Sequence, residues 1–475
     1  MPSISDDIFF AGITEINQKL TKKEFSAVEL ARAFCDRLEA IGPRYNALAL
    51  SLRKVAISDA KDVDGDIKRE RLRGPLQGIP FGAKDLLSYA KHPTTWGAQP
   101  YAGQVFDYTA SALAHIQKRG GLLTGKLAMV ELAGGPSYRY ASASLTGPGL
   151  NPWDNTRWSG GSSSGSAIAV ASGLVTYALG SETSGSILTP SAFCGVTGLR
   201  PTYGLVSRYG AMALSWTLDK IGPICRSAED CGLVLEAIAG ADPDDLSSAH
   251  KSFYYTPQFS RDLKDVTVGF APADFNEAVD PAARADYAKA LEIIRSLGVH
   301  VVETKLPEFP YGSVIGAIIS AEGSAIFEPL IKSGKVDQLA DQRQIAGLKA
   351  GLEIPAKDYL KAMRIRSLIQ EAFRDLLSTV DVLMAPTRLD PAPKITQPLD
   401  RRSRPASTAA GLTALIPAGN LAGLPALSLP CGFANGMPMG LQLVGSPFSE
   451  NMLLAIGRTF QERTDWHKRR PPIAT

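Results

Sequence analysis

Apolar positions along the chain recur at two spacings, one typical of helices and the other typical of strands. Leu30, Phe34 and Leu38 follow the helical spacing. Ser26 and Glu29 come just before them, and their positions relative to each other are those of a capping box. The pattern therefore predicts a helix that begins next to Ser26.

A strand, a helix and a second strand are predicted in succession in the C-terminal half. The apolar run 266–270 predicts a strand, and the pair Asp280-Pro281 marks the start of a helix. Gly298 ends that helix, and 301–302 begins the next strand. Two further elements are predicted, a long helix at about 357–377 and a strand at 382–384. Strands that alternate with helices favour an α/β fold around a largely parallel sheet.

Short apolar strands and helices are predicted next to the residues that could take part in catalysis. Residues 75–87 contain a turn and then a short apolar strand, with Lys84 near its end. In 110–132, two helical patterns flank a short strand. Small residues dominate 164–172, which suits a helix packed closely against a sheet, and 174–179 predicts a strand that leads into a serine-rich loop. We also expect a surface loop in the proline-rich stretch that runs from Arg388 to Ser407.

Composition is that of a folded, soluble globular protein. Of the 475 residues, 45% are hydrophobic and 20% are charged, and the net charge is only +3. This balance gives no reason to expect nucleic acid or a membrane surface as a partner. The chain opens without the features of a signal peptide and has no apolar run long enough for a membrane helix. We therefore expect a cytoplasmic protein with free thiols at Cys35, Cys194, Cys225, Cys231 and Cys431.

Two serine-rich loops and one lysine supply the parts of a hydrolytic site. The loops are 160–166 and 180–187, and the lysine is Lys84. A serine becomes a nucleophile only when a base removes its proton. None of the three segments contains a histidine, but a lysine can act as the base when its surroundings keep it neutral.

Each of these segments has a simpler interpretation when it is taken alone. The second loop fits an ordinary strand-to-helix turn, the first fits a flexible linker, and Lys84 fits a surface lysine. A phosphate-binding loop is excluded for 180–187, because Ile187-Leu188 stands where a lysine and a hydroxyl are needed. A Ser-His-Asp triad is not excluded by spacing, but the histidines are scattered, at His92, His115, His250, His300 and His467.

Taken together, the segments resemble the amidase signature family, whose members use a Ser–cis-Ser–Lys triad. The resemblance covers nearly the whole chain, and it rests on the segments Leu76–Pro80 with Lys84-Asp85, Asn151–Asp154, Ser159–Ser163, Pro190–Thr202, Gly423–Ala426 and Gly440–Gly445. It implies a large mixed, mostly parallel central sheet covered by helices on both faces. It also implies one domain over 1–475, with a catalytic core at about 70–230 and a C-terminal part at about 260–475 that completes the sheet and the substrate pocket.

Carried over position by position, the resemblance makes Ser186 the nucleophile, Ser162 the cis-serine and Lys84 the base. The backbone N–H groups of Thr183, Ser184, Gly185 and Ser186 would form the oxyanion hole. Lys84 would have to be neutral, so its pKa would have to fall by about 3 from its ordinary value. The resemblance implies no metal and no cofactor.

Three positions depart from the usual pattern of the family. Ser184 stands where glycine is usual, Glu182 where aspartate is usual, and Leu188 where arginine is frequent. We infer a pocket for an uncharged, fairly apolar group. The aromatic residues Trp96, Tyr138 and Tyr140 are candidates for its lining, although packing in the core or at the surface also explains them.

The predicted activity is hydrolysis of C–N bonds in small or aryl amides, or in carbamates (urethanes), by a monomer or homodimer. Within the same family, the alternative is the glutaminase subunit of a tRNA-dependent amidotransferase, which would need partner subunits. A non-catalytic binding protein on the same scaffold is a third hypothesis.

Overall fold

The computed structural model describes residues 4–135, 138–259, 261–399 and 411–473. Within these residues, eleven strands form one sheet in the order β1-β3-β2-β6-β8-β7-β12-β13-β11-β9-β10. In chain order, these strands are Leu48–Ser51 (β1), Pro80–Lys84 (β2), Leu122–Leu127 (β3), Tyr177–Glu182 (β6), Thr197–Arg200 (β7), Lys220–Cys225 (β8), Thr267–Phe270 (β9), His300–Glu303 (β10), Val382–Pro386 (β11), Ala426–Ala434 (β12) and Met437–Gly445 (β13). Two short strands, Leu150–Asn151 (β4) and Asp154–Trp158 (β5), form a separate ribbon.

The sheet is mixed, as predicted, but its parallel share is smaller than predicted. Parallel pairing joins β2 to β3 and β6, and β9 to β10 and β11. The other described pairings in this sheet are antiparallel. One cause is the hairpin of β12 and β13, whose tight turn Asn435-Gly436 has φ values of 51° and 77°. An Asn-Gly turn with two positive φ angles joins antiparallel neighbours only.

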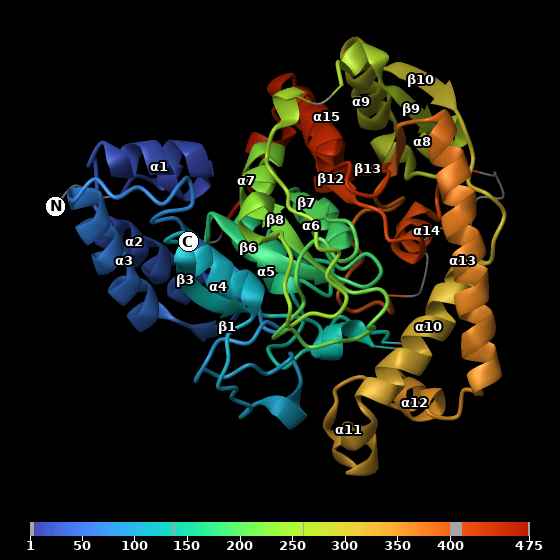
Figure 1. Ribbon diagram of the computed structural model, residues 1–475, viewed down its shortest axis with the longest axis horizontal. Helices are drawn as coiled ribbons and strands as arrows, with labels where there is room; N and C mark the ends of the chain where they lie inside the picture. The colour runs from blue at the N-terminus through green and yellow to red at the C-terminus, as the bar shows by residue number, and fades with distance from the viewer. Residues whose placement is uncertain (1–3, 136–137, 260, 400–410, 474–475) are drawn as a thin grey trace.

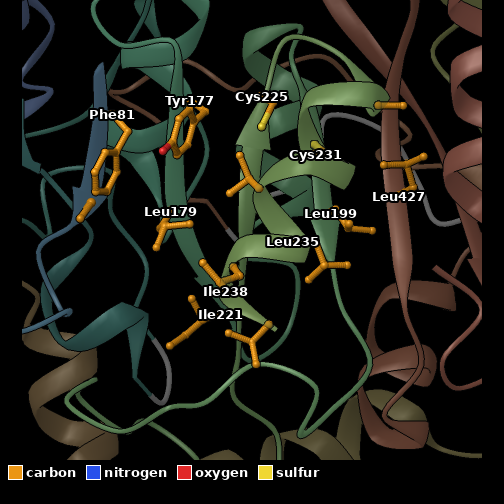
Figure 2. Close-up of a cluster of buried hydrophobic side chains, with 14 of the residues drawn as sticks. Phe81, Tyr177, Leu179, Leu199, Ile221, Cys225, Cys231, Leu235, Ile238 and Leu427 are labelled. Atoms are coloured by element: carbon orange, nitrogen blue, oxygen red, sulfur yellow. The ribbon is translucent and has the colours of Figure 1, made fainter. Parts of the chain in front are cut away.

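Helices cover both faces of the sheet (Figure 1). One face packs against Ser111–Lys118 (α4), Ala228–Ile238 (α7), Arg284–Ser296 (α9) and Glu450–Glu462 (α15). The other face packs against Ser164–Ala171 (α5), Leu188–Cys194 (α6) and Leu415–Ala422 (α14). Successive strand residues point to opposite faces. Tyr177 and Leu179 of β6 therefore join the α7 side, which Figure 2 shows, whereas Ala178 joins the α5 side.

Two groups of helices lie at opposite sides of the molecule (Figure 1). The N-terminal group consists of Ile13–Thr21 (α1), Ala27–Ile41 (α2) and Arg53–Lys68 (α3). The other group consists of Tyr311–Ile326 (α10), Glu328–Lys332 (α11), Gln342–Gly351 (α12) and Ala356–Thr379 (α13), and the short helix Pro272–Asn276 (α8) lies beside β11. Helices α10 and α13 pack side by side, and both contact α14 at the sheet.

Several predicted elements are present with nearly the predicted bounds. Ser26 and Glu29 form the capping box of α2. The predicted strand–helix–strand unit is β9, α9 and β10, with parallel strands. The long helix is α13 and the following strand is β11.

Other predictions were wrong in detail. The strand predicted at 174–179 is β6, which begins at Tyr177. Gly173 has a φ of 62°, and the Leu174 nitrogen donates to the Ala169 oxygen, so the turn that ends α5 occupies the first predicted strand residues. In 110–132 the second helical pattern is a 3₁₀ turn at Glu131–Gly134. The loop predicted at 388–407 lies only partly within the described residues.

No helix among the described residues has both the length and the apolar character needed to cross a membrane.

Candidate active site

Lys84 is the last residue of β2, and every residue of that strand is buried. Its Nζ atom lies 2.7 Å from Ser162 Oγ and 2.9 Å from Ser181 Oγ. Ser162 precedes α5, and Ser181 belongs to β6, the strand next to β2. The end of one buried strand thus carries an amine that contacts two hydroxyl groups.

Ser162 is held next to Ser186 by the backbone. The Gly161–Ser162 peptide bond is cis. The next nitrogen along the chain, that of Ser163, donates a hydrogen bond of 3.3 Å to the carbonyl oxygen of Ser186. A side chain at Gly161 would have its Cβ 2.7 Å from Val130, so only glycine fits this packing. The structure therefore brings Lys84, Ser162 and Ser186 together.

The other serines of the first loop attach α5 to the sheet. Ser163 Oγ accepts a hydrogen bond from the nitrogen of Ser181 and donates to its carbonyl oxygen, each at 3.2 Å. Ser166 Oγ donates to the Leu179 oxygen at 3.0 Å. The hydroxyls of Ser163 and Ser166 are thus satisfied by β6, which fixes the position of the neighbouring Ser162 relative to the strand.

Glu182 holds the far end of the second loop. Its Oε2 accepts hydrogen bonds from the nitrogens of Ile187 and Leu188, at 2.9 and 3.0 Å, at the start of α6. Its Oε1 accepts from Arg200 and from Asn420. Burial opposes ionisation of Glu182, but the charge of Arg200 and these hydrogen bonds outweigh it, so the pKa of Glu182 lies below its usual range.

The backbone between Glu182 and α6 presents four N–H groups, those of Thr183, Ser184, Gly185 and Ser186. None of them donates a hydrogen bond to another described residue. Gly185 has a φ of 92°, a conformation that favours glycine. Ser184 and Ser186 are partly exposed, so a substrate can approach this turn. Free N–H groups at such a turn suit the stabilisation of a developing negative charge.

The surroundings of Lys84 favour its neutral form. Complete burial lowers its pKa, and the carboxylates of Asp219 and Glu182 offset part of that effect, which leaves the pKa of Lys84 at about 7. An ordinary lysine has a pKa of about 10.4. Near pH 7, a substantial fraction of Lys84 is therefore unprotonated and able to accept a proton.

A cavity of about 500 Å³ adjoins this site. Its lining includes Ser181 and Thr183 and is largely apolar, with Leu86, Met212, Leu214 and Ile221 among the apolar residues. Trp216, which is exposed, and Arg208 also line it. The cavity has room for a small organic group with an apolar body.

The predicted aromatic residues do not line this cavity. Trp96 packs against Tyr101, Phe106 and Phe327, and Tyr140 is exposed. Leu188, at the position where the family often has arginine, is fully buried in an apolar cluster with residues of α10, α13 and α14. No cation therefore occupies that position.

Sequence reasoning missed several residues of the site. Ser181 binds Lys84, Asp219 binds the Thr183 hydroxyl, and Asn420 binds Glu182. A hydroxyl near the end of the strand beside Lys84 is the one signal that could have indicated Ser181. The partners of Thr183 and Glu182 lie too far along the chain for any local pattern to connect them. None of the five histidines forms a described hydrogen bond with Lys84, Ser162 or Ser186.

The family model for amidases matches residues 29–454. Among the glutamyl-tRNA(Gln) amidotransferase A subunits, the one from Carboxydothermus hydrogenoformans is 35% identical, over 98% of this chain and 100% of that protein. The peptide amidase of Stenotrophomonas maltophilia has a similar structure, with a TM-score of 0.83 and 28% identity over 98% of each chain. Another of these amidotransferase A subunits, from Thermotoga maritima, has a solved structure with a TM-score of 0.79 and 26% identity over 100% of each chain.

The family match, the relatives and the fold agree with one another. The protein belongs to the amidase signature family of enzymes that hydrolyse C–N bonds.

Proposed function

We propose that the protein cleaves an amide C–N bond through an acyl-enzyme at Ser186, with Ser162 and Lys84 as the proton relay. The observation that carries this proposal is the buried Lys84 amine, 2.7 Å from Ser162 Oγ, with Ser162 held against Ser186. A lysine that is neutral near pH 7 can serve as a general base for a serine.

The reaction would proceed in two halves. Ser186 Oγ attacks the carbonyl carbon while its proton passes to Ser162, whose own proton passes to Lys84. The N–H groups of residues 183–186 stabilise the oxyanion. The C–N bond then breaks, and the leaving nitrogen takes a proton back through Ser162. In the second half, water attacks the Ser186 ester by the same relay, and the acid is released.

For the amide, we propose glutamine, with the protein acting as the glutaminase subunit of a tRNA-dependent amidotransferase. The support is the similarity to amidotransferase A subunits, which extends over nearly the full length of both chains. Cleavage of the glutamine side chain would give a glutamyl ester on Ser186 and release ammonia for a glutamyl-tRNA acceptor. The protein would then act together with partner subunits, and not as the monomer or homodimer expected from the sequence. We propose that this complex works in the cytoplasm.

A second candidate is a stand-alone hydrolase of uncharged amides or carbamates. Two observations favour it: the apolar walls of the cavity beside Ser181 and the buried Leu188 in place of a cation. A small apolar substituent on the acyl or amine side would suit that cavity.

The domain division expected from the sequence, one domain over 1–475, stays part of this proposal for either substrate.

A serine-directed fluorophosphonate probe tests the catalytic assignment. The wild-type protein should be labelled, and Ser186→Ala should not. Equal labelling of the two proteins would refute the role of Ser186.

Substrate assays separate the two candidates. Glutaminase activity that appears only when partner subunits copurify supports the amidotransferase. Rapid hydrolysis of neutral anilides by the isolated chain, without activity on glutamine, supports the stand-alone hydrolase instead.

A further inference from the structure

We propose that Asp219 is a positioning residue that fixes the oxyanion loop, residues 183–186, and that Glu322 anchors the segment carrying Asp219 to the helices α10 and α13. The inference rests on the proposed function of the oxyanion loop. Asp219 and Glu322 do not touch the reacting atoms in this scheme. They act through the loop that does.

Asp219 joins two segments of the chain with both of its carboxylate oxygens. Oδ1 accepts a hydrogen bond of 2.6 Å from Thr183 Oγ1. Oδ2 accepts hydrogen bonds of 2.8 and 2.9 Å from the nitrogens of Leu214 and Ser215. Because Asp219 is buried, these bonds are little weakened by solvent. The side chain of Thr183, the first residue of the oxyanion loop, is therefore fixed to the segment 214–219.

The oxyanion loop is thus held at both ends by carboxylates. Asp219 holds Thr183 at its start, and Glu182 holds the nitrogens of Ile187 and Leu188 just after its end. The N–H groups between these two anchors have no described partner of their own. Their direction consequently depends on the anchors. Catalytic donors of this kind contribute most when their direction is fixed before the reaction.

Glu322 holds the segment 214–219 from the side of α10. It is buried, and its carboxylate accepts hydrogen bonds from the Ser215 hydroxyl and from both the nitrogen and the hydroxyl of Thr217. Tyr359 of α13 donates to the same carboxylate at 2.7 Å. Arg366, also of α13, donates to the carbonyl oxygen of Thr217 at 2.8 Å.

A continuous series of hydrogen bonds therefore runs from α13 to the oxyanion loop. It passes from Tyr359 to Glu322, then through the segment 214–219 to Asp219, and ends at Thr183. A displacement of α10 or α13 would have to strain or break one of these bonds. The geometry of the oxyanion loop is in this way linked to two helices that contribute no residue to the lining of the cavity.

Asp219 also has an electrostatic effect that a purely structural residue would lack. Its negative charge and that of Glu182 both raise the pKa of Lys84, against the lowering by burial. Burial raises the pKa of Asp219 and the guanidinium of Arg208 offsets part of this effect, whereas burial lowers the pKa of the neighbouring Lys220 well below its usual value. When Asp219 is neutralised, protonated Lys84 loses a favourable partner, so Lys84 releases its proton at lower pH. The acid limb of the pH–rate profile should move in that direction.

Four variants test the inference through the rate of fluorophosphonate labelling, measured from pH 5 to pH 9. We expect Thr183→Val to slow labelling by roughly 10- to 100-fold, since small misplacements of catalytic groups have effects of about that size. Thr183→Ser, which keeps the hydroxyl, should restore most of the rate. Asp219→Asn should slow labelling and also move the acid limb to lower pH. Glu322→Gln should slow labelling without moving the acid limb.

The control is Asp375→Asn, which neutralises an exposed carboxylate of α13 that does not line the cavity. It should leave both the rate and the pH profile unchanged. Circular dichroism melting at each pH identifies any variant that fails to fold. If Asp219→Asn or Glu322→Gln does not fold, the labelling rates of Thr183→Ser and Thr183→Val are compared to test the inference. Wild-type labelling rates in both Asp219→Asn and Thr183→Val would overturn the inference. Absence of labelling in the wild type would instead overturn the proposed function itself.

Discussion

At the scale of single residues, the proposed role of Lys84 as the base sets the pH range over which the site should work. Its pKa of about 7 means that it is mostly neutral above that pH and mostly protonated below it. In the proposed relay, only the neutral amine can accept the proton of Ser162. We therefore expect the acylation rate to fall about tenfold for each pH unit below 7 and to level off above it.

The measurement is single-turnover acylation by a substrate that does not itself titrate between pH 5 and pH 9. Lys84→Ala should reduce the rate by roughly 10³-fold or more, because members of such a relay act as a unit. A wild-type rate that is constant from pH 5 to pH 8 would show that Lys84 is not the base.

Glu182 and Arg200 form a fully buried ion pair with an N–O distance of 2.9 Å. Removing one charge leaves the other buried without its partner, which typically destabilises a protein by about 3–5 kcal/mol. We expect Glu182→Gln to lower the free energy of unfolding by about this amount, as measured by urea denaturation.

A matched control for this variant is Glu328→Gln. Glu328 pairs with Lys332 on the surface, at 2.7 Å. An exposed pair contributes only about 0–1 kcal/mol, so the same chemical change should have little effect there. Equal losses in the two variants would contradict the special role of the buried pair.

At the scale of elements, close packing places α5, and with it Ser162, against the sheet. A Cβ at Gly165 would lie 2.5 Å from the backbone nitrogen of Ala128, the residue that follows β3. Gly165→Ala should therefore displace α5, lower the melting temperature and reduce the acylation rate. Gly65→Ala in α3 is the control, because a Cβ there meets nothing within 4 Å.

Alanine at Gly65 should stabilise α3 by about 0.5–1 kcal/mol, since glycine is a poor helix former. The two variants make the same chemical change inside a helix and differ in the space around it. Thermal melting and acylation rates distinguish them. Equal melting temperatures for the two variants would show that α5 can shift away from β3 without loss.

Local signals explain which elements could be predicted from the sequence. The capping box of α2, the strand of Lys84 and the unit of β9, α9 and β10 all depend on residues close together in the chain. The start of β6 was misplaced because the turn after α5 is as apolar as the strand itself. The three serine and lysine positions came from resemblance, because no single segment specified them.

The missing parts of the site depend on contacts between distant residues. Glu182 and Asn420 are 238 positions apart, and Ser215 and Glu322 are 107 apart. Nothing in the neighbourhood of any of these residues indicates its partner. Such pairs follow from the order of strands in the sheet and from the packing of α10, and neither is encoded in a local pattern.

At the scale of the whole molecule, the sheet order is the feature that the sequence did not indicate. Strands β12 and β13 come late in the chain but lie in the middle of the sheet, between β7 and β11. Without them, β7 and β11 would each present an unpaired edge, and an exposed edge strand promotes aggregation. We therefore expect a fragment that ends at residue 424 to be insoluble or to lack a cooperative unfolding transition.

Coexpression of residues 425–475 as a separate chain is the control, and it should restore soluble protein by supplying the missing hairpin. Circular dichroism melting and size-exclusion chromatography are the measurements. A soluble fragment 1–424 with a sharp melting transition would show that the rest of the sheet forms without β12 and β13.

The central position of this hairpin also has a consequence for biosynthesis. The ribosome completes Lys84, Ser162 and Ser186 long before it reaches β12, so a nascent chain carries all three reactive side chains while its sheet is still divided. Asn420, which binds Glu182 and so supports the nucleophile's turn, is translated just before that hairpin. Hydrolytic competence should therefore arise only after β12 and β13 have been translated, so a nascent chain that still lacks them should not cleave amides.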